Sequence, residues 1–133
     1  MKKLRIGIVG FGFIGPHHLD AIRRLGFAEV AALATSSAEG ARAKAKEHYV
    51  PKAYGDWREL IADPEIDVVD IVTPTALHAP IAIAAARAGR HVIVDKPMAC
   101  TSREARTMLA AARAAGVGHA VTFSIRYNVM LEQ

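Results

Sequence analysis

The chain has 133 residues, with 17 Lys and Arg against 13 Asp and Glu, and 52% of its residues are hydrophobic. A chain of this length and composition buries a core of its own, which excludes intrinsic disorder and any need for disulfide or metal staples. The net charge of +4 is small and scattered, and no window reaches the ~18 apolar residues of a membrane span, so we expect neither a nucleic-acid nor a membrane partner.

Short β-branched runs alternate along the chain with alanine-rich segments of helical spacing. The predicted strands cover residues 4–9, 29–34, 52–54, 67–72, 91–94 and 119–123. The predicted helices cover residues 15–25, 37–48, 56–61, 75–88 and 101–116. Strict alternation of this kind is typical of βαβ units around a parallel sheet. Because no linker or composition break divides the chain, we expect residues 1–133 to form one doubly wound α/β domain with three layers, αβα.

A glycine-rich motif, Gly10-Phe11-Gly12-Phe13-Ile14-Gly15, joins the first predicted strand to the first predicted helix. In a G-x-G-x-x-G turn the first glycine allows a tight turn, the second lets a pyrophosphate approach the backbone, and the third lets the helix pack on the strand. The helix N–H groups then face the phosphates. Glycines also form ordinary turns, but this position favours a Rossmann dinucleotide site made by Gly10, Gly12, Phe13, Ile14 and Gly15.

The end of the second strand bears on the choice of cofactor. An acidic residue there would bind the ribose hydroxyls of NAD, but Thr35, Ser36 and Ser37 stand in its place. Neutral hydroxyls, with Arg42 nearby, do not repel a 2′-phosphate and are able to hydrogen-bond to it. The sequence therefore favours NADP and leaves NAD open, with Thr35, Ser36 and Arg42 as candidate contacts. The alternative is that a serine simply caps the second helix, with either cofactor.

Polar residues also follow the fourth, fifth and sixth strands, at the edge of the sheet where an open α/β fold binds its ligands. They are Thr73, Pro74, Thr75 and His78 after the fourth strand, Asp95 and Lys96 after the fifth, and Arg126 after the sixth. A lysine in such a crevice is a common proton carrier or hydroxyl-orienting group, so Lys96 is the candidate catalytic residue. The alternative is that Asp95-Lys96-Pro97 is only a structural strand end.

These motifs together resemble the amino-terminal domain of the glucose–fructose oxidoreductase/inositol dehydrogenase (Gfo/Idh/MocA) family. The resemblance rests on the glycine loop followed by His18, the Thr73-Pro74 turn with His78, Asp95-Lys96-Pro97, and the closing Phe123 to Tyr127, and it covers nearly the whole chain. It implies that the turn and His78 border the nicotinamide half of the cofactor, and that Lys96 contacts the nicotinamide ribose and the reacting hydroxyl. Asp95 stands where the family usually has glutamate, and Thr75 where asparagine is frequent.

The resemblance implies hydride transfer between a nicotinamide cofactor and a secondary alcohol of a sugar, a cyclitol or a related substrate. In the family a following α+β domain supplies the base and the substrate pocket, and 133 residues do not include one. The first interpretation is a cofactor domain of an oxidoreductase that is inactive without a second domain. The alternatives are a free-standing NAD(P) sensor or docking module, and an enzyme whose other half comes from a different chain.

The remaining residues suggest no further chemistry. Six histidines show no ligand spacing with acids or with Cys100, so we expect no metal site. A lone cysteine fits a reducing compartment, and we expect a cytoplasmic location. An uncovered crevice rim leaves apolar surface exposed, which predicts self-association into a homo-oligomer.

Overall fold

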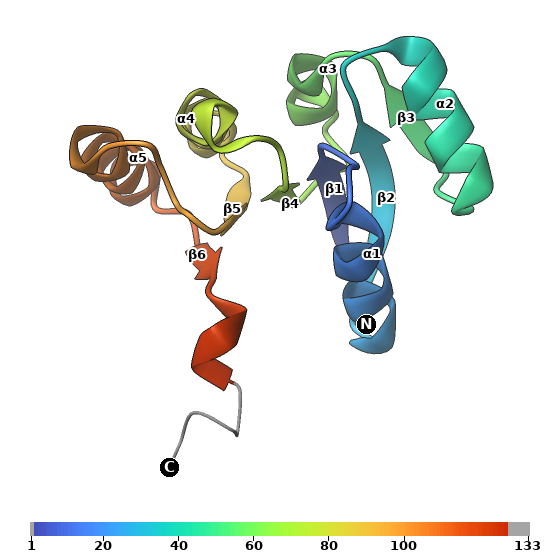
Figure 1. Cartoon of the computed structure of the whole chain (residues 1–133), viewed down its shortest axis with the longest axis horizontal. Coiled ribbons are helices and arrows are strands. Elements are labelled where there is room, and N and C mark those ends of the chain that lie inside the picture. The colour runs from blue at the N-terminus through green and yellow to red at the C-terminus, as the bar shows by residue number, and fades with distance from the viewer. Residues whose placement is uncertain (1, 128–133) are drawn as a thin grey trace.

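The computed structural model describes residues 2–127, and strands and helices alternate throughout this part of the chain (Figure 1). The strands are β1 (Leu4–Val9), β2 (Ala28–Ala34), β3 (Lys52–Tyr54), β4 (Val68–Ile71), β5 (His91–Asp95) and β6 (His119–Thr122). The α-helices are α1 (Gly15–Arg24), α2 (Ala38–Glu47), α3 (Trp57–Ala62), α4 (His78–Arg87) and α5 (Ser102–Ala115). Short 3-10 turns cover Thr75–Leu77 and Ser124–Tyr127.

All six strands form one parallel sheet in the order β3-β2-β1-β4-β5-β6. The chain moves outward from β1 through β2 to β3, then returns to the other side of β1 and continues from β4 to β6. This order confirms the predicted doubly wound sheet. Because the winding reverses beside β1, the loops after β1 and β4 separate there and leave a crevice at the carboxyl ends of the strands.

Helices cover both faces of the sheet and confirm the three-layer prediction. One apolar cluster joins the sheet to α1 and α2 and includes Ile8, Leu19 and Ala41. A second cluster, on the opposite face, joins the sheet to α3, α4 and α5 and includes Ile81 and Met108. Burial of both faces explains why every residue of β4 is buried, instead of every second one.

Local sequence signals set the ends of most helices. Thr101 and Glu104 form a capping box at the start of α5, in which each side chain accepts a hydrogen bond from the other residue's backbone N–H. Gly116 ends the same helix with a φ of 66°, a left-handed conformation that glycine adopts without strain. At α2 the N-cap is Ser37, whose Oγ accepts a hydrogen bond from Gly40 N at 3.1 Å.

The helix predicted over residues 75–88 differs from the observed one. Thr75–Leu77 form a 3-10 turn, and α4 begins only at His78. Pro80 explains the difference, because its ring nitrogen has no hydrogen and would interrupt a helix that began at Thr75. In a helix that begins at His78, Pro80 lies in the first turn, where a backbone N–H would have no acceptor within the helix in any case. The turn before α4 therefore stays free to border the crevice.

None of the helices within residues 2–127 has the length and hydropathy needed to cross a lipid bilayer.

Candidate dinucleotide-binding site

Gly10 holds the glycine loop tightly between the ends of β2 and β4. Its N–H donates to the carbonyl oxygen of Ala34 at 2.9 Å. Its φ is 87°, and a Cβ at this position would lie 2.9 Å from backbone atoms of Val72 and Thr73. Both the dihedral angle and the contact exclude any other residue, so the turn that opens the site requires glycine here.

The other two glycines of the motif serve different purposes. A Cβ on Gly15 would lie 2.9 Å from the ring of Phe11, so this glycine allows α1 to pack against the loop. Gly12 has nothing within 4 Å of the position where a Cβ would stand. The fold therefore does not need a glycine at position 12, and the open space there suits close approach of a ligand to the backbone.

The first turn of α1 is arranged to receive an anion. Its N-cap, Ile14, makes no side-chain hydrogen bond to the helix, and the first turn contains no acidic residue. Pro16 occupies one of the first helical positions, where its missing N–H costs nothing. The remaining N–H groups at this end are free of side-chain caps and carry the positive end of the helix dipole. These properties fit the pyrophosphate of a dinucleotide.

A cavity of about 830 Å³ lies beside this loop at the carboxyl edge of the sheet. Six of the residues predicted to contact the cofactor line it: Gly10, Gly12, Thr35, Ser36, Thr73 and Pro74. The loops after β1, β2 and β4 therefore meet around one space, as the sequence predicted. The hydroxyl oxygen of Thr73 is buried and has no hydrogen-bond partner among the described residues. A buried hydroxyl without a partner at the wall of a cavity fits a polar ligand.

Hydroxyl side chains follow β2, and some of them already make hydrogen bonds within the protein. Thr35 Oγ1 donates to the carbonyl oxygen of Ser37 at 2.9 Å, which fixes the path of the loop into α2. Arg42 is exposed and does not line the cavity, whereas Lys44, two residues or about half a turn later on α2, does. The helix therefore presents a lysine to this end of the cavity, at a position the sequence analysis did not single out.

A second wall of the cavity comes from the start of α3, which the sequence analysis also missed. Arg58 lies over the ring of Trp57, 4.2 Å from its centroid, and both line the cavity. Asp56 caps α3 by accepting from Arg58 N at 2.9 Å, and this hydrogen bond is the main reason why the pKa of Asp56 is below its ordinary value. Trp57 also packs against the core, as expected, so its sequence position alone did not reveal its second role.

Lys96 is exposed directly after β5, on the turn next to Thr73 and Pro74. It takes part in no ion pair within residues 2–127. The neighbouring Asp95 accepts a hydrogen bond from Thr122 Oγ1 at 2.9 Å, which ties β5 to β6. The lysine is therefore unpaired at the same edge of the sheet as the cavity, while the carboxylate beside it has a structural partner.

The other predicted contacts lie outside the lining of this cavity. Phe13 is 89% exposed above the glycine loop, and its ring lies against that of His17. Ile14 and Gly15 belong to the start of α1, Thr75 begins the 3-10 turn before α4, and Arg126 is exposed after β6. None of these five residues lines the cavity. Their contacts with a cofactor therefore stay predictions.

His78 does not occupy the position expected for a ligand contact. Its side chain is buried, with only 1% exposed, and its two ring nitrogens lie 3.0 Å from the carbonyl oxygen of Pro97 and 2.8 Å from that of Thr73. Both nitrogens are therefore engaged with backbone behind the two turns. Tertiary contacts direct this ring toward the protein, and the expectation that His78 borders the cofactor stays a prediction.

His18 pairs with a buried carboxylate on the face of the sheet beneath α1. Its Nδ1 donates to Asp70 Oδ2 at 2.8 Å, and Asp70 Oδ1 has no partner among the described residues. The hydrogen bond to Asp70 is the main reason why the pKa of His18 is raised above 6.5, with burial acting in the opposite direction. The pair joins the first turns of α1 to β4, so it braces the helix whose N-terminus faces the cavity.

We predict that this pair makes the free energy of unfolding depend on pH. Because the folded pKa of His18 is raised, the contribution is complete below about pH 6.5 and is lost as the pH rises through the folded value. The substitution Asp70→Asn should lower the free energy of unfolding at pH 6 by about 1–2 kcal/mol and should matter less at pH 9. Urea denaturation at several pH values measures this difference.

The exposed neighbour His17 supplies the control, and His17→Gln should leave the pH profile unchanged. Equal losses for Asp70→Asn at pH 6 and pH 9 would contradict the role of the ion pair.

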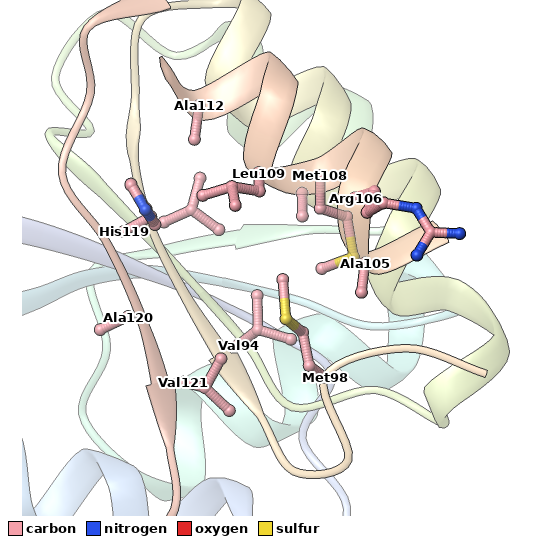
Figure 2. A pocket seen from close by; sticks show the side chains of 12 residues that line it. Val94, Met98, Ala105, Arg106, Met108, Leu109, Ala112, His119, Ala120 and Val121 are labelled. Atoms are coloured by element: carbon pink, nitrogen blue, oxygen red, sulfur yellow. The ribbon is translucent and has the colours of Figure 1, made fainter. Parts of the chain in front are cut away.

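A second cavity, of about 390 Å³, lies between α5 and the edge strand β6 (Figure 2). Val94, Met98, Leu109 and Val121 line it, whereas the guanidinium group of Arg106 points away from it. This cavity is almost wholly apolar, and it shares no lining residue with the cavity beside the glycine loop. The glycine loop, the residues after β2 and the Thr73–Pro74 turn therefore border the glycine-loop cavity and not this one.

Comparison with known proteins agrees with this geometry. Levoglucosan dehydrogenase from Pseudarthrobacter phenanthrenivorans is 40% identical over 134 residues, which cover 95% of this chain and 34% of that protein. The crystal structure of an NAD-binding oxidoreductase from Klebsiella pneumoniae superposes with a TM-score of 0.92 at 42% identity, covering 95% of this chain and 36% of that one. The WlbA dehydrogenase from Bordetella pertussis, solved with NADH and UDP-GlcNAcA, superposes with a TM-score of 0.92 at 32% identity, covering 98% of this chain and 40% of that one.

The chain thus spans between a third and two fifths of the length of these relatives. Residues 4–123 match the sequence model of the Gfo/Idh/MocA oxidoreductase family, described by its NAD-binding Rossmann fold. The chain accordingly belongs to this family, and its described residues form the family's dinucleotide-binding domain.

Proposed function

We propose that this chain is the cofactor-binding part of an oxidoreductase that acts on a secondary alcohol of a sugar, a cyclitol or a related substrate. The observation that carries the proposal is the glycine-loop cavity, where an open Gly12, an uncapped helix N-terminus and the unpartnered Thr73 hydroxyl meet. Of the relatives named above, one is a levoglucosan dehydrogenase and another is a dehydrogenase solved with UDP-GlcNAcA, which supports the substrate class. Bound NAD or NADP would supply the hydride chemistry.

We assign different tasks to the residues along the cavity. The glycine loop and the first turn of α1 bind the pyrophosphate, with Phe13 and Ile14 beside it. Thr35, Ser36 and Lys44 surround the adenosine end, with Arg42 and Arg58 at its margin. On the nicotinamide side, Thr73, Pro74, Thr75 and Arg126 border the ring, Asp95 orients the turn, and Lys96 binds the substrate hydroxyl and takes part in moving its proton.

A second, substrate-binding domain completes the enzyme in this proposal, because the described residues form a cofactor site without a substrate pocket. We also propose a homo-oligomer in the cytoplasm. Exposed apolar side chains near the edge strand, namely Val121, Phe123 and Ile125, support self-association. The exposed free thiol of Cys100 supports a reducing compartment.

Two glycine substitutions separate cofactor binding from folding. We predict that Gly12→Ala leaves the free energy of unfolding within about 0.5 kcal/mol of the wild type, because its Cβ meets no protein atom. The same change should lower the affinity for NADH at least about tenfold, because the Cβ fills the space that the pyrophosphate would enter. Titration of NADH fluorescence and urea denaturation measure the two effects.

The matched control is Gly10→Ala, which should cost about 2 kcal/mol or more in stability because of its positive φ and its contact with β4. Full NADH affinity in a folded Gly12→Ala variant, or no NADH binding by the wild type at millimolar concentration, would refute the proposed site.

Two lysine substitutions distinguish the two ends of the cavity. We predict that Lys96→Ala lowers the affinity for NADH about fivefold or more and leaves the affinity for ADP unchanged, because ADP lacks the nicotinamide half. The substitution Lys44→Ala should lower the affinity for both NADH and ADP, because Lys44 lines the end of the cavity assigned to the adenosine. Calorimetric titration of each variant with NADH and with ADP measures this pattern.

Equal weakening of NADH and ADP by Lys96→Ala would place this lysine away from the nicotinamide side.

Cofactor choice is tested at the end of β2. We predict that Thr35→Asp lowers the affinity for NADPH about tenfold relative to NADH, because a carboxylate beside the ribose repels a 2′-phosphate. The control is Thr35→Asn, which has the same shape without the charge and loses the same hydrogen bond to Ser37.

The measurement is the ratio of NADPH to NADH dissociation constants for the three proteins. An unchanged ratio in Thr35→Asp would show that position 35 does not face the ribose.

A further inference from the structure

The buried imidazole of His78 joins two turns that the backbone leaves separate. Thr73 follows β4, which ends at Ile71, and Pro97 follows β5, which ends at Asp95. The two strands are paired as far as Ile71 and Val94. Beyond that point no backbone hydrogen bond within the described chain connects residues 73–77 to residues 96–100. The position of one turn relative to the other therefore depends on side chains.

Both contacts of the ring are directed at groups that only accept hydrogen bonds. His78 Nε2 lies 2.8 Å from the carbonyl oxygen of Thr73, and Nδ1 lies 3.0 Å from that of Pro97. A carbonyl oxygen only accepts, so the ring donates its N–H to one of the two carbonyls and lies in contact with the other. The rigid ring thus touches both turns at once, whereas a glutamine amide in its place is flexible and does not present atoms on two opposite sides of a plane.

The base of this side chain is rigid. His78 is the first residue of α4, and the adjoining Ala79, Ile81 and Ala82 are buried in the core beneath the sheet. The ring itself is 1% exposed, so water does not compete for its two contacts. A ring that is fixed on a helix end and contacts both carbonyls thus transmits the position of α4 to both turns.

We propose that His78 is a positioning residue that sets the Lys96–Pro97 turn against the Thr73–Pro74 turn and thereby holds Lys96 in place at the nicotinamide side of the cavity. This inference rests on the proposed function, since the position of Lys96 matters only if that side of the cavity receives the nicotinamide half of a dinucleotide. His78 acts through the two turns and does not touch the ligand.

The first experiment observes the ring directly in the ¹⁵N-labelled chain, without any ligand. Long-range ¹H–¹⁵N spectra should show one tautomer of His78, with the hydrogen on one ring nitrogen protected from exchange by burial. The assignment comes from the signals that disappear in His78→Gln. A ring that populates both tautomers and exchanges its hydrogen freely with water would overturn the proposed contacts, and this result does not depend on whether the chain binds a cofactor.

The second experiment asks whether the contacts position the nicotinamide side. His78→Gln and His78→Phe should each lower the affinity for NADH about fivefold or more and change the affinity for ADP less than about twofold. A merely structural role would lower stability, or weaken both ligands alike, without this selective loss. The glutamine variant retains a donor and approximate size, so it provides a folded variant if the aromatic replacement does not fold.

The control is His91→Phe at the opposite end of β5. His91 accepts a hydrogen bond from Gly118 N at 2.8 Å, so its loss should affect stability and leave the ratio of NADH to ADP affinity unchanged. Equal losses for NADH and ADP in both His78 variants would overturn the positioning role. A wild-type chain that binds ADP but not NADH would contradict the proposed function, and the positioning role with it.

Discussion

The close approach of Gly10 to the end of β4 is the constraint on which the site depends. A side chain at position 10 would collide with the backbone of Val72 and Thr73, and the hydrogen bond from Gly10 N to Ala34 O ties the same residue to β2. One residue without a side chain therefore brings the loops after three parallel strands together. The cavity, the open Gly12 and the uncapped first turn of α1 follow from this contact, because all of them lie directly beyond it.

Two sets of polar side-chain contacts extend this constraint along the sheet. His18 and Asp70 brace α1 against β4, and His78 braces the turn after β4 against the turn after β5. Buried polar groups are costly unless they are paired, so pairs that persist in such positions restrict the chain to one arrangement. Beyond the last paired residues of β4 and β5, the carboxyl edge of the sheet is consequently held by the contacts of His78.

Much of this was predictable because it depends on local sequence patterns. Alternating strand and helix periods determine the order of elements, and the position of the glycine motif after the first strand indicates which loop opens the site. Thr101 and Glu104 predicted the start of α5 by their spacing. Pro80 shows the limit of the same approach, since the alanine-rich segment predicted a longer helix and the missing N–H of one residue shortened it.

The sequence by itself determined the doubly wound fold, the glycine turn and the set of loops that meet at the carboxyl edge, because these follow from residue periodicity and from backbone conformations that only glycine adopts. Only the tertiary structure decided which side chains face the cavity. The rotation of each helix against the sheet decides which of its side chains reach the cavity. This rotation brings Lys44 to the cavity instead of Arg42, and it places Trp57 and Arg58 in the cavity wall. It also turns the ring of His78 inward. That rotation is set by packing between residues far apart in the chain, which no local pattern records.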